Sequence, residues 1–141
     1  MLKARRGPDE ARRVVRELLS AVVREDISAL RSVLDNNAAF RRTFAGQGED
    51  AVSVWLTRFS LHDYGSPGAR RVTERELDVF SESDLSRYQG RHPVGVGDDE
   101  YAVRLRPRTL RDLFGEELWF VVAEREPGFR ITQLIEDYSP R

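Results

Sequence analysis

Residues 117 to 138 constrain the fold more than any other part of this sequence, because they contain two strand patterns and the link between them. Apolar, β-branched and aromatic runs at 118–123 and 129–135 flank a short polar segment. Within that segment Pro127 presets its own φ angle, and Gly128 can adopt the positive φ that a tight turn requires. The stretch therefore predicts a β-hairpin whose register is set by its own turn.

The two predicted strands differ in the faces that they bury. In the last strand the period of two places Leu134 on the face opposite to Gln133, which lies among apolar residues. The preceding strand is apolar on both faces, so both faces need a cover. Helices can supply one cover, and the other must be a loop, a terminus or a second copy of the chain. We therefore expect a homodimer whose interface includes Trp119, Val121 and Leu134.

Length and composition narrow the classes of protein. A chain of 141 residues is expected to form one domain, 1–141, with residues 1–7 as a flexible tail. It contains no cysteine, which excludes disulfides and thiolate metal sites and suits a reducing cytoplasm. No apolar run approaches the roughly 20 residues of a membrane span, and the first residues lack the apolar core of a signal peptide. We expect a cytoplasmic protein with no membrane partner.

The charge of the chain gives no general attraction for nucleic acid, because the formal net charge is −1. We therefore expect no nucleic-acid partner. If strand alternation holds, Arg104, Arg106 and Arg130 face outward together. They would form either an anion-binding patch or a solvated sheet face opposite acidic residues.

Helical patterns come first in the chain. Apolar residues at helical spacing predict a helix over 8–24, and Asp26 is placed to cap a second, short helix. A third helix is predicted over 49–61, with Trp55 and Phe59 in its apolar stripe.

Strand patterns follow the helices. Residues 38–44 indicate a small extended segment, and strands are predicted over 72–80 and 101–106. Residues 85–92 are either a further strand or a loop over the sheet, and residues 110–114 are compatible with one helical turn. Helices followed by an antiparallel sheet are typical of the α+β class.

This order of elements resembles the nuclear transport factor two-like superfamily, the cone-shaped, cystatin-like α+β fold shared with SnoaL-like cyclases and ketosteroid isomerases. The residues that carry the resemblance are 24–30 after the first helix, Trp55-Leu56 in the third, and 119–122 and 128–132 in the hairpin. The resemblance implies three N-terminal helices packed on a curved antiparallel sheet, a pocket between them for a small apolar ligand, and no cofactor.

The resemblance also indicates where chemistry would occur. Isomerase members carry a tyrosine on the first helix and a base on the extended segment, but here these elements offer apolar residues and Phe40-Arg41-Arg42. The remaining acid–base candidates are His62 and Asp63 at the end of the third helix, because histidine titrates near neutrality. Neighbouring side chains on a helix point apart, so a simple helix end is the alternative interpretation. The histidines show no metal-binding spacing, and no metal is expected.

A ligand in the implied pocket would meet Trp55, Phe59, Tyr101 and Gln133. Gln133 is the polar member of an apolar face, and a buried amide needs a partner. That partner is either a polar group of the ligand or a neighbouring main-chain group. Tyr101 either donates to a ligand or packs in the core.

Three functions therefore remain open. The first is a bacterial, dimerising domain that binds a small apolar molecule without catalysis. The second is a SnoaL-like isomerase, cyclase or dehydratase with His62 or Asp63 as its base, acting on a small cyclic substrate. The third is a protein-interaction module whose interior is filled by its own side chains. An enzyme needs a titratable group that lines a cavity, a binding domain needs the cavity alone, and an interaction module needs neither.

Overall fold

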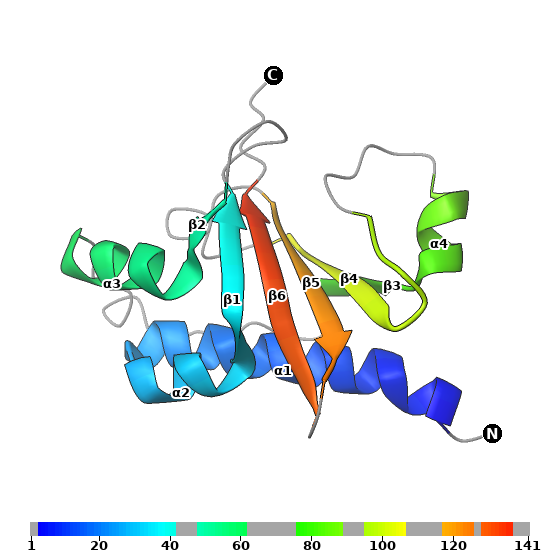
Figure 1. Cartoon of the computed structure of the whole chain (residues 1–141), viewed down its shortest axis with the longest axis horizontal. Helices are drawn as coiled ribbons and strands as arrows, with labels where there is room; N and C mark the ends of the chain where they lie inside the picture. The colour runs from blue at the N-terminus through cyan, green and yellow to red at the C-terminus, as the bar shows by residue number, and fades with distance from the viewer. Residues whose placement is uncertain are drawn as a thin grey trace.

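The structure is a computed structural model that describes residues 3–41, 48–61, 76–88, 95–106, 117–125 and 128–136 (Figure 1). The elements follow one another as α1 (Lys3–Arg24), α2 (Ile27–Val33), β1 (Leu34–Arg41), β2 (Glu49–Asp50), α3 (Ala51–Leu61), β3 (Leu77–Phe80), α4 (Glu82–Arg87), β4 (Glu100–Leu105), β5 (Leu118–Glu124) and β6 (Phe129–Glu136). The predicted α+β class, with three helices before most of the sheet, is confirmed.

All six strands belong to one open sheet, in the order β2-β1-β6-β5-β4-β3. The predicted hairpin is confirmed, because β5 and β6 pair antiparallel and the main-chain N–H of Arg125 donates to the carbonyl of Gly128 at 2.7 Å. The expectation of a purely antiparallel sheet was wrong, because β1 runs parallel to β6. Local patterns could not reveal this pairing, since the two strands are far apart in the sequence.

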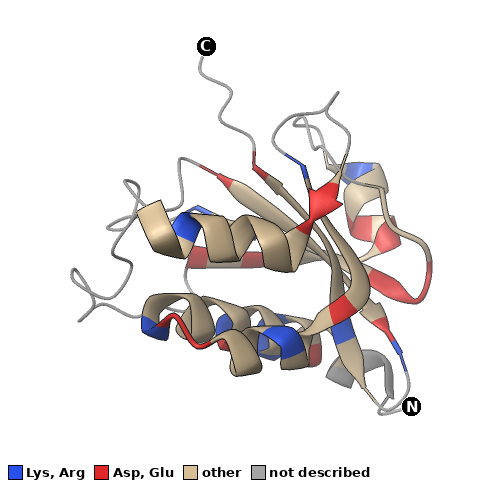
Figure 2. Ribbon diagram, turned by 60° about the vertical axis from the view of Figure 1, so that its left-hand side comes forward, with Lys and Arg blue, Asp and Glu red and all other residues tan. Residues whose placement is uncertain are grey.

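The sheet has a helix face and an outer face. Helices α1, α2 and α3 bury their apolar residues against the helix face, and the largest fully buried side chains there are Leu18, Leu19, Leu30, Leu34, Phe40, Trp55, Leu105, Leu118 and Phe120. A smaller apolar cluster on the outer face includes Leu85 of α4. Acidic and basic residues are interspersed over the helices and strands (Figure 2).

Two helix boundaries differ in how well the sequence indicated them. Helix α1 begins at Lys3, five residues before the predicted start, so Pro8 lies inside the helix and removes one main-chain hydrogen bond. Helix α2 starts as predicted, because the Asp26 carboxylate accepts a hydrogen bond from the Ala29 N–H at 3.1 Å.

Helix α4 occupies part of a segment expected to be a strand or a loop. Its start is a capping box: the Ser81 hydroxyl accepts from the Asp84 N–H at 3.2 Å, and the Asp84 carboxylate accepts from the Ser81 N–H at 2.9 Å. This hydrogen bond from the Ser81 main chain lowers the pKa of the Asp84 carboxyl. A serine and an aspartate three residues apart are a signal for a helix start, and the expectation of a strand or loop did not take it into account.

A β-bulge interrupts the pairing of the last two strands. Val122 pairs with Ile131, and Val121 pairs with Gln133. Thr132 is therefore an extra residue on β6, and it does not take a place in the ladder. Because side chains alternate with a period of two, one extra residue places every following side chain of β6 on the opposite face.

The bulge overturns the predicted position of Leu134. This residue pairs with Phe120 and is fully buried in the cluster on the helix face, together with helices α1 to α3. Gln133 instead pairs with Val121 on the outer face. The prediction that Leu134 shares a face with Trp119 and Val121 was wrong, because unbroken alternation was assumed.

The start of α1 contacts the sheet so closely that only glycine fits at position 7. A Cβ atom on Gly7 would lie 2.0 Å from the Tyr101 hydroxyl oxygen and 2.6 Å from the ring carbon that carries it. Alanine is normally the better helix former by about 1 kcal/mol. We nevertheless expect Gly7→Ala to lower the free energy of unfolding by about 1–2 kcal/mol, because overpacking displaces the ring.

Urea unfolding in two backgrounds tests this contact. In Tyr101→Ala, which removes the ring, Gly7→Ala should become neutral or stabilising. A loss of stability that is equal in both backgrounds would contradict the contact.

Candidate functional site

A buried ion pair lies on the helix face, where β5 begins and β6 ends. Both terminal nitrogens of Arg58, on α3, donate to the two carboxylate oxygens of Glu136, with Nη2 and Oε1 2.7 Å apart. The exposed fractions of the two side chains are 13% and 1%. Glu136 pairs with Leu118 in the ladder, so its carboxylate points toward the helices. Among the buried, inward side chains of the described strands, Glu136 is the one that carries a charge.

Two aromatic rings lie against the Arg58 guanidinium, and a third packs on one of them. The Phe40 and Trp55 rings meet edge to face with their centroids 5.6 Å apart, and the Trp55 and Phe59 centroids are 6.2 Å apart. The central guanidinium carbon of Arg58 lies 4.8 Å from the Phe40 centroid and 5.7 Å from the Trp55 centroid, within cation–π range. We call Phe40, Trp55, Arg58, Phe59 and Glu136 the Arg58 site.

Helical spacing explains why α3 supplies three members of the Arg58 site. Residues three and four apart share a face of a helix, so Arg58 and Phe59 lie beside Trp55. The start of α3 is held by Asp50, whose carboxylate accepts a hydrogen bond from the Ser53 N–H at 3.0 Å. The spacing of Arg58 from Trp55 was a visible signal. The inward direction of Glu136 follows the bulge, and the sequence pattern does not show it.

The chemistry open to the Arg58 site is limited by its own pairing. Both oxygens of Glu136 already accept hydrogen bonds from Arg58, so a substrate would have to compete with Arg58 for this carboxylate. The rings of Phe40 and Trp55 are fully buried, so the half-buried Phe59 is the ring of this site that offers apolar surface. This arrangement suits packing against a flat or compact apolar molecule better than it suits proton transfer.

The four predicted ligand-binding residues do not converge. Trp55 and Phe59 lie together in the Arg58 site. Tyr101 is on the helix face but pairs with Val122, four residues along β5 from Leu118, or about 13 Å at about 3.3 Å per residue.

The fourth residue, Gln133, lies on the outer face. Its side-chain oxygen accepts a hydrogen bond from Arg41 at 2.9 Å. The partner of this amide is therefore a side chain, whereas we had expected a polar group of a ligand or a neighbouring main-chain group.

The acid–base candidates His62 and Asp63 lie outside the described residues. Within the described ranges, no group of three or more His, Cys, Asp or Glu side chains is placed to hold a metal ion. No helix in the described part of the chain is long and apolar enough to cross a membrane.

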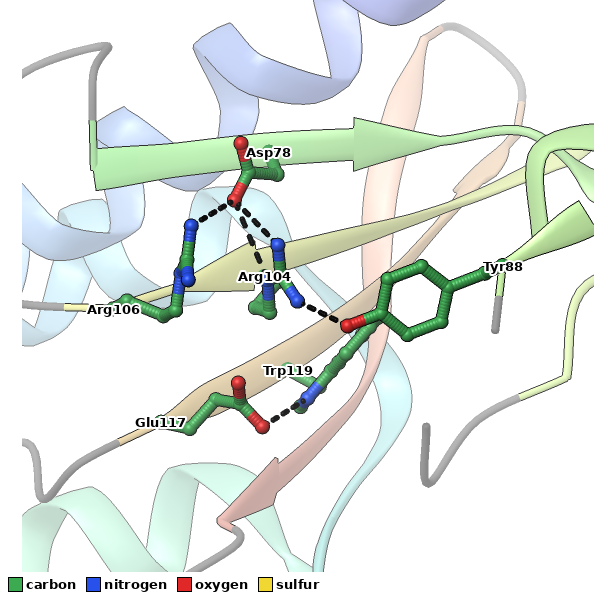
Figure 3. A network of polar contacts seen from close by, with 6 residues as sticks. All are labelled: Asp78, Tyr88, Arg104, Arg106, Glu117 and Trp119. Carbon is green, nitrogen blue, oxygen red and sulfur yellow. Dashed lines mark hydrogen bonds and ion pairs between the residues drawn. The ribbon is translucent and has the colours of Figure 1, made fainter. Parts of the chain in front are cut away.

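A second polar cluster lies on the outer face, around Arg104 of β4 (Figure 3). Its Nη2 donates to Asp78 of β3 at 2.9 Å, and its Nη1 donates to the Tyr88 hydroxyl at 2.5 Å. The central guanidinium carbon lies between 5.3 and 5.7 Å from the ring centroids of Phe80, Tyr88 and Trp119. The cluster therefore connects strands β3, β4 and β5 to the residue that follows α4.

The electrostatics of Arg104 favour a structural role. Burial alone would lower the pKa of this guanidinium, but the hydrogen bond to Asp78 and the attraction of Tyr88 and Asp78 raise its pKa above the ordinary value. Arg106 also reaches the Asp78 carboxylate, at 3.4 Å. The anion patch proposed for Arg104, Arg106 and Arg130 does not form, because Arg130 lies two strands away from Arg104 and donates to the Leu34 carbonyl at 3.3 Å.

The apolar outer side of β5 is covered within the chain. Trp119 and Val121 are 0% and 1% exposed and form a cluster with Leu85 of α4, Ala102 and Ile135. Their burial therefore does not require a second copy. The homodimer stays a prediction that a single chain does not test.

No family model and no curated protein matches the chain. Its structure is similar to that of an uncharacterised protein with a cystatin-like fold from Caulobacter vibrioides, with a TM-score of 0.53, 9% identity, and coverage of 92% of this chain and 87% of that one. It is also similar to an NTF2-like protein with a cystatin-like fold from Novosphingobium aromaticivorans, with a TM-score of 0.53, 11% identity, and coverage of 95% and 82%.

A third structure, from Shewanella frigidimarina, is described as a candidate ketosteroid isomerase. It gives a TM-score of 0.49 at 15% identity, with coverage of 92% of this chain and 96% of that one. At these identities the likenesses concern the fold and not the activity. The chain therefore has the nuclear transport factor two-like, or cystatin-like, α+β fold.

Proposed function

We propose that this chain is a non-catalytic binding domain that takes a small apolar molecule at the Arg58 site. The observation that carries the proposal is the pairing of Arg58 with Glu136 beside Trp55 and Phe59. The pair neutralises its own charges and occupies both carboxylate oxygens, while the half-buried Phe59 ring leaves apolar surface on the same helix. Ligand sites commonly combine aromatic walls with a few fixed polar groups in this way.

Partial exposure on α3 supports the same proposal. Val52 and Phe59 are half-buried, and Leu56 is 43% exposed. These residues are four and three positions apart, so they form one apolar stripe along the helix. A compact apolar ligand packed at Phe59 would bury more of this surface, which is favourable by about 25 cal/mol per Å².

Calorimetry with two cage-shaped compounds tests the proposal. We expect 1-adamantanol to bind the wild-type protein, and Phe59→Ala to weaken binding about tenfold, because truncating an aromatic contact costs roughly 1–2 kcal/mol of affinity. Leu61→Ala is the matched control, because Leu61 lies two residues further along α3 and is 70% exposed. 1-Adamantane carboxylate, which differs by one charge, shows whether the Arg58 guanidinium is accessible to a ligand.

Three outcomes would count against this function. Absence of binding by both compounds would favour an interaction module with a filled interior. Equal weakening in Phe59→Ala and Leu61→Ala would place the binding elsewhere. Recovery of an altered compound after incubation would favour the enzyme, and His62→Ala would then be the first variant to assay.

A further inference from the structure

Two arginines on the outer face differ from most others in the described part of the chain. Arg41 of β1 donates from Nη2 to the side-chain oxygen of Gln133 at 2.9 Å. Arg130 of β6 donates from Nη1 to the main-chain carbonyl of Leu34 at 3.3 Å. Both arginines are half-buried, and both partners are neutral oxygens.

Most other described arginines are matched with carboxylates. The pairs are Arg12 with Asp9, Arg13 with Glu10 and Glu17, Arg24 with Asp26, Arg58 with Glu136, Arg87 with Asp84, Arg104 and Arg106 with Asp78, and Arg125 with Asp35. Among the residues that the structure describes, no carboxylate lies within ion-pair distance of Arg41 or Arg130. Their charges are therefore not compensated by a described neighbour.

The acidic residues near this pair are already engaged. The Asp35 carboxylate lies 3.8 Å from Arg125, with which it is paired. Glu100 and Arg130 both pair with Ala123, which lies between them on β5, so their strands are about 10 Å apart. The Glu100 carboxylate accepts the Gly97 N–H at 2.9 Å.

The register brings the two guanidiniums to one part of the outer face. Arg41 extends to Gln133, and Arg130 lies two ladder positions before Gln133 on β6, about 7 Å away at about 3.3 Å per position. Strands β1 and β6 are hydrogen-bonded neighbours, so both side chains are anchored on rigid elements. Each guanidinium is fixed by a bond on one side and retains further N–H donors.

Half-buried charges without a counter-charge are costly, and a bound anion would remove that cost. A guanidinium presents parallel N–H groups that match the oxygens of a carboxylate or a phosphate. A neutral acceptor holds the side chain in position without cancelling its charge, which is the arrangement that an anion site requires.

We propose that Arg41 and Arg130 form a binding site for an oxyanion, a carboxylate or phosphate group of a small ligand, on the outer face at the β1–β6 pair. The site is separate from the Arg58 site, because the two lie on opposite faces of the sheet. It does not depend on the function proposed above.

Calorimetric titration of the whole chain at low ionic strength tests this proposal. Tripolyphosphate and citrate are the probes, and they distinguish phosphate from carboxylate recognition. We expect one of them to bind, with an affinity that falls as salt is added. Arg41→Gln and Arg130→Gln should each weaken binding at least about tenfold, because each removes a charge-assisted contact.

Arg31→Gln is the matched control, because Arg31 is an exposed arginine on α2 with no ion-pair partner among the described residues. It should leave binding unchanged. Arg41→Lys keeps the charge but loses the fork, and an intermediate affinity is expected. Melting curves followed by circular dichroism show whether each variant is folded, and Arg41→Lys still tests the site if a glutamine variant is not.

Three results would overturn the site. The first is that neither probe binds the wild-type protein at low salt. The second is that Arg31→Gln weakens binding as much as the two site variants do. The third is that folded Arg41→Gln and Arg130→Gln bind with unchanged affinity.

Discussion

Replacing Leu134 with arginine is expected to lower the free energy of unfolding more than any other change considered. Leu134 is fully buried on the helix face and pairs with Phe120 at the centre of the core. An arginine there would place an unpaired charge among apolar side chains, and costs above about 4 kcal/mol are typical of that change. Because the free energy of unfolding of a small domain is about 5–15 kcal/mol, this change removes much of the stability of the chain.

Leu56→Arg is the matched control, because it makes the same chemical change on α3 where the leucine is 43% exposed. Its free energy of unfolding should stay within about 0.5 kcal/mol of wild type. Urea unfolding and far-ultraviolet circular dichroism measure both variants. A Leu134→Arg protein with wild-type stability would show that Leu134 faces outward and that the bulge at Thr132 is absent.

Breaking the buried ion pair is expected to have the next largest effect. Glu136→Gln keeps the shape of the side chain but leaves the Arg58 charge, 13% exposed, without its counter-charge. Removing one partner of a buried pair costs about 3–5 kcal/mol, and we expect about 3 kcal/mol because the amide still accepts one hydrogen bond. Chemical denaturation measures the change.

Two further variants separate the charge from the packing. Arg58→Met combined with Glu136→Met should recover most of the lost stability, because apolar replacement of a whole buried pair is often nearly neutral. Asp9→Asn breaks an exposed pair with Arg12 and should change the free energy of unfolding by less than about 1 kcal/mol. Equal losses for Glu136→Gln and Asp9→Asn would mean that the Arg58–Glu136 pair is not buried.

Elements with strong local signals were predictable from the sequence. The last hairpin, the cap of α2 and the apolar stripe of α3 depend on residues close together in the chain. Trp55 and Phe59 were accordingly expected to lie together, and their ring centroids are 6.2 Å apart, while their part in ligand binding stays a prediction.

Features that depend on register were not predictable. One extra residue, Thr132, moved Leu134 to the core and Gln133 to the outer face. The same shift turned Glu136 toward Arg58. The simple alternation of side chains could not predict this ion pair. The parallel pairing of β1 with β6 depends on contacts between distant segments, which no local pattern encodes.

The most direct test of the central claim uses the two indole N–H signals in a nitrogen-15 NMR spectrum. Trp55 lies in the Arg58 site and Trp119 on the outer face, so each indole reports on one side of the sheet. Trp119→Phe assigns the signals, and 1-adamantanol is then titrated into the wild-type protein. A shift of the Trp55 signal with Trp119 unmoved is the predicted result. A shift of Trp119 alone, or of neither signal, would contradict binding at the Arg58 site.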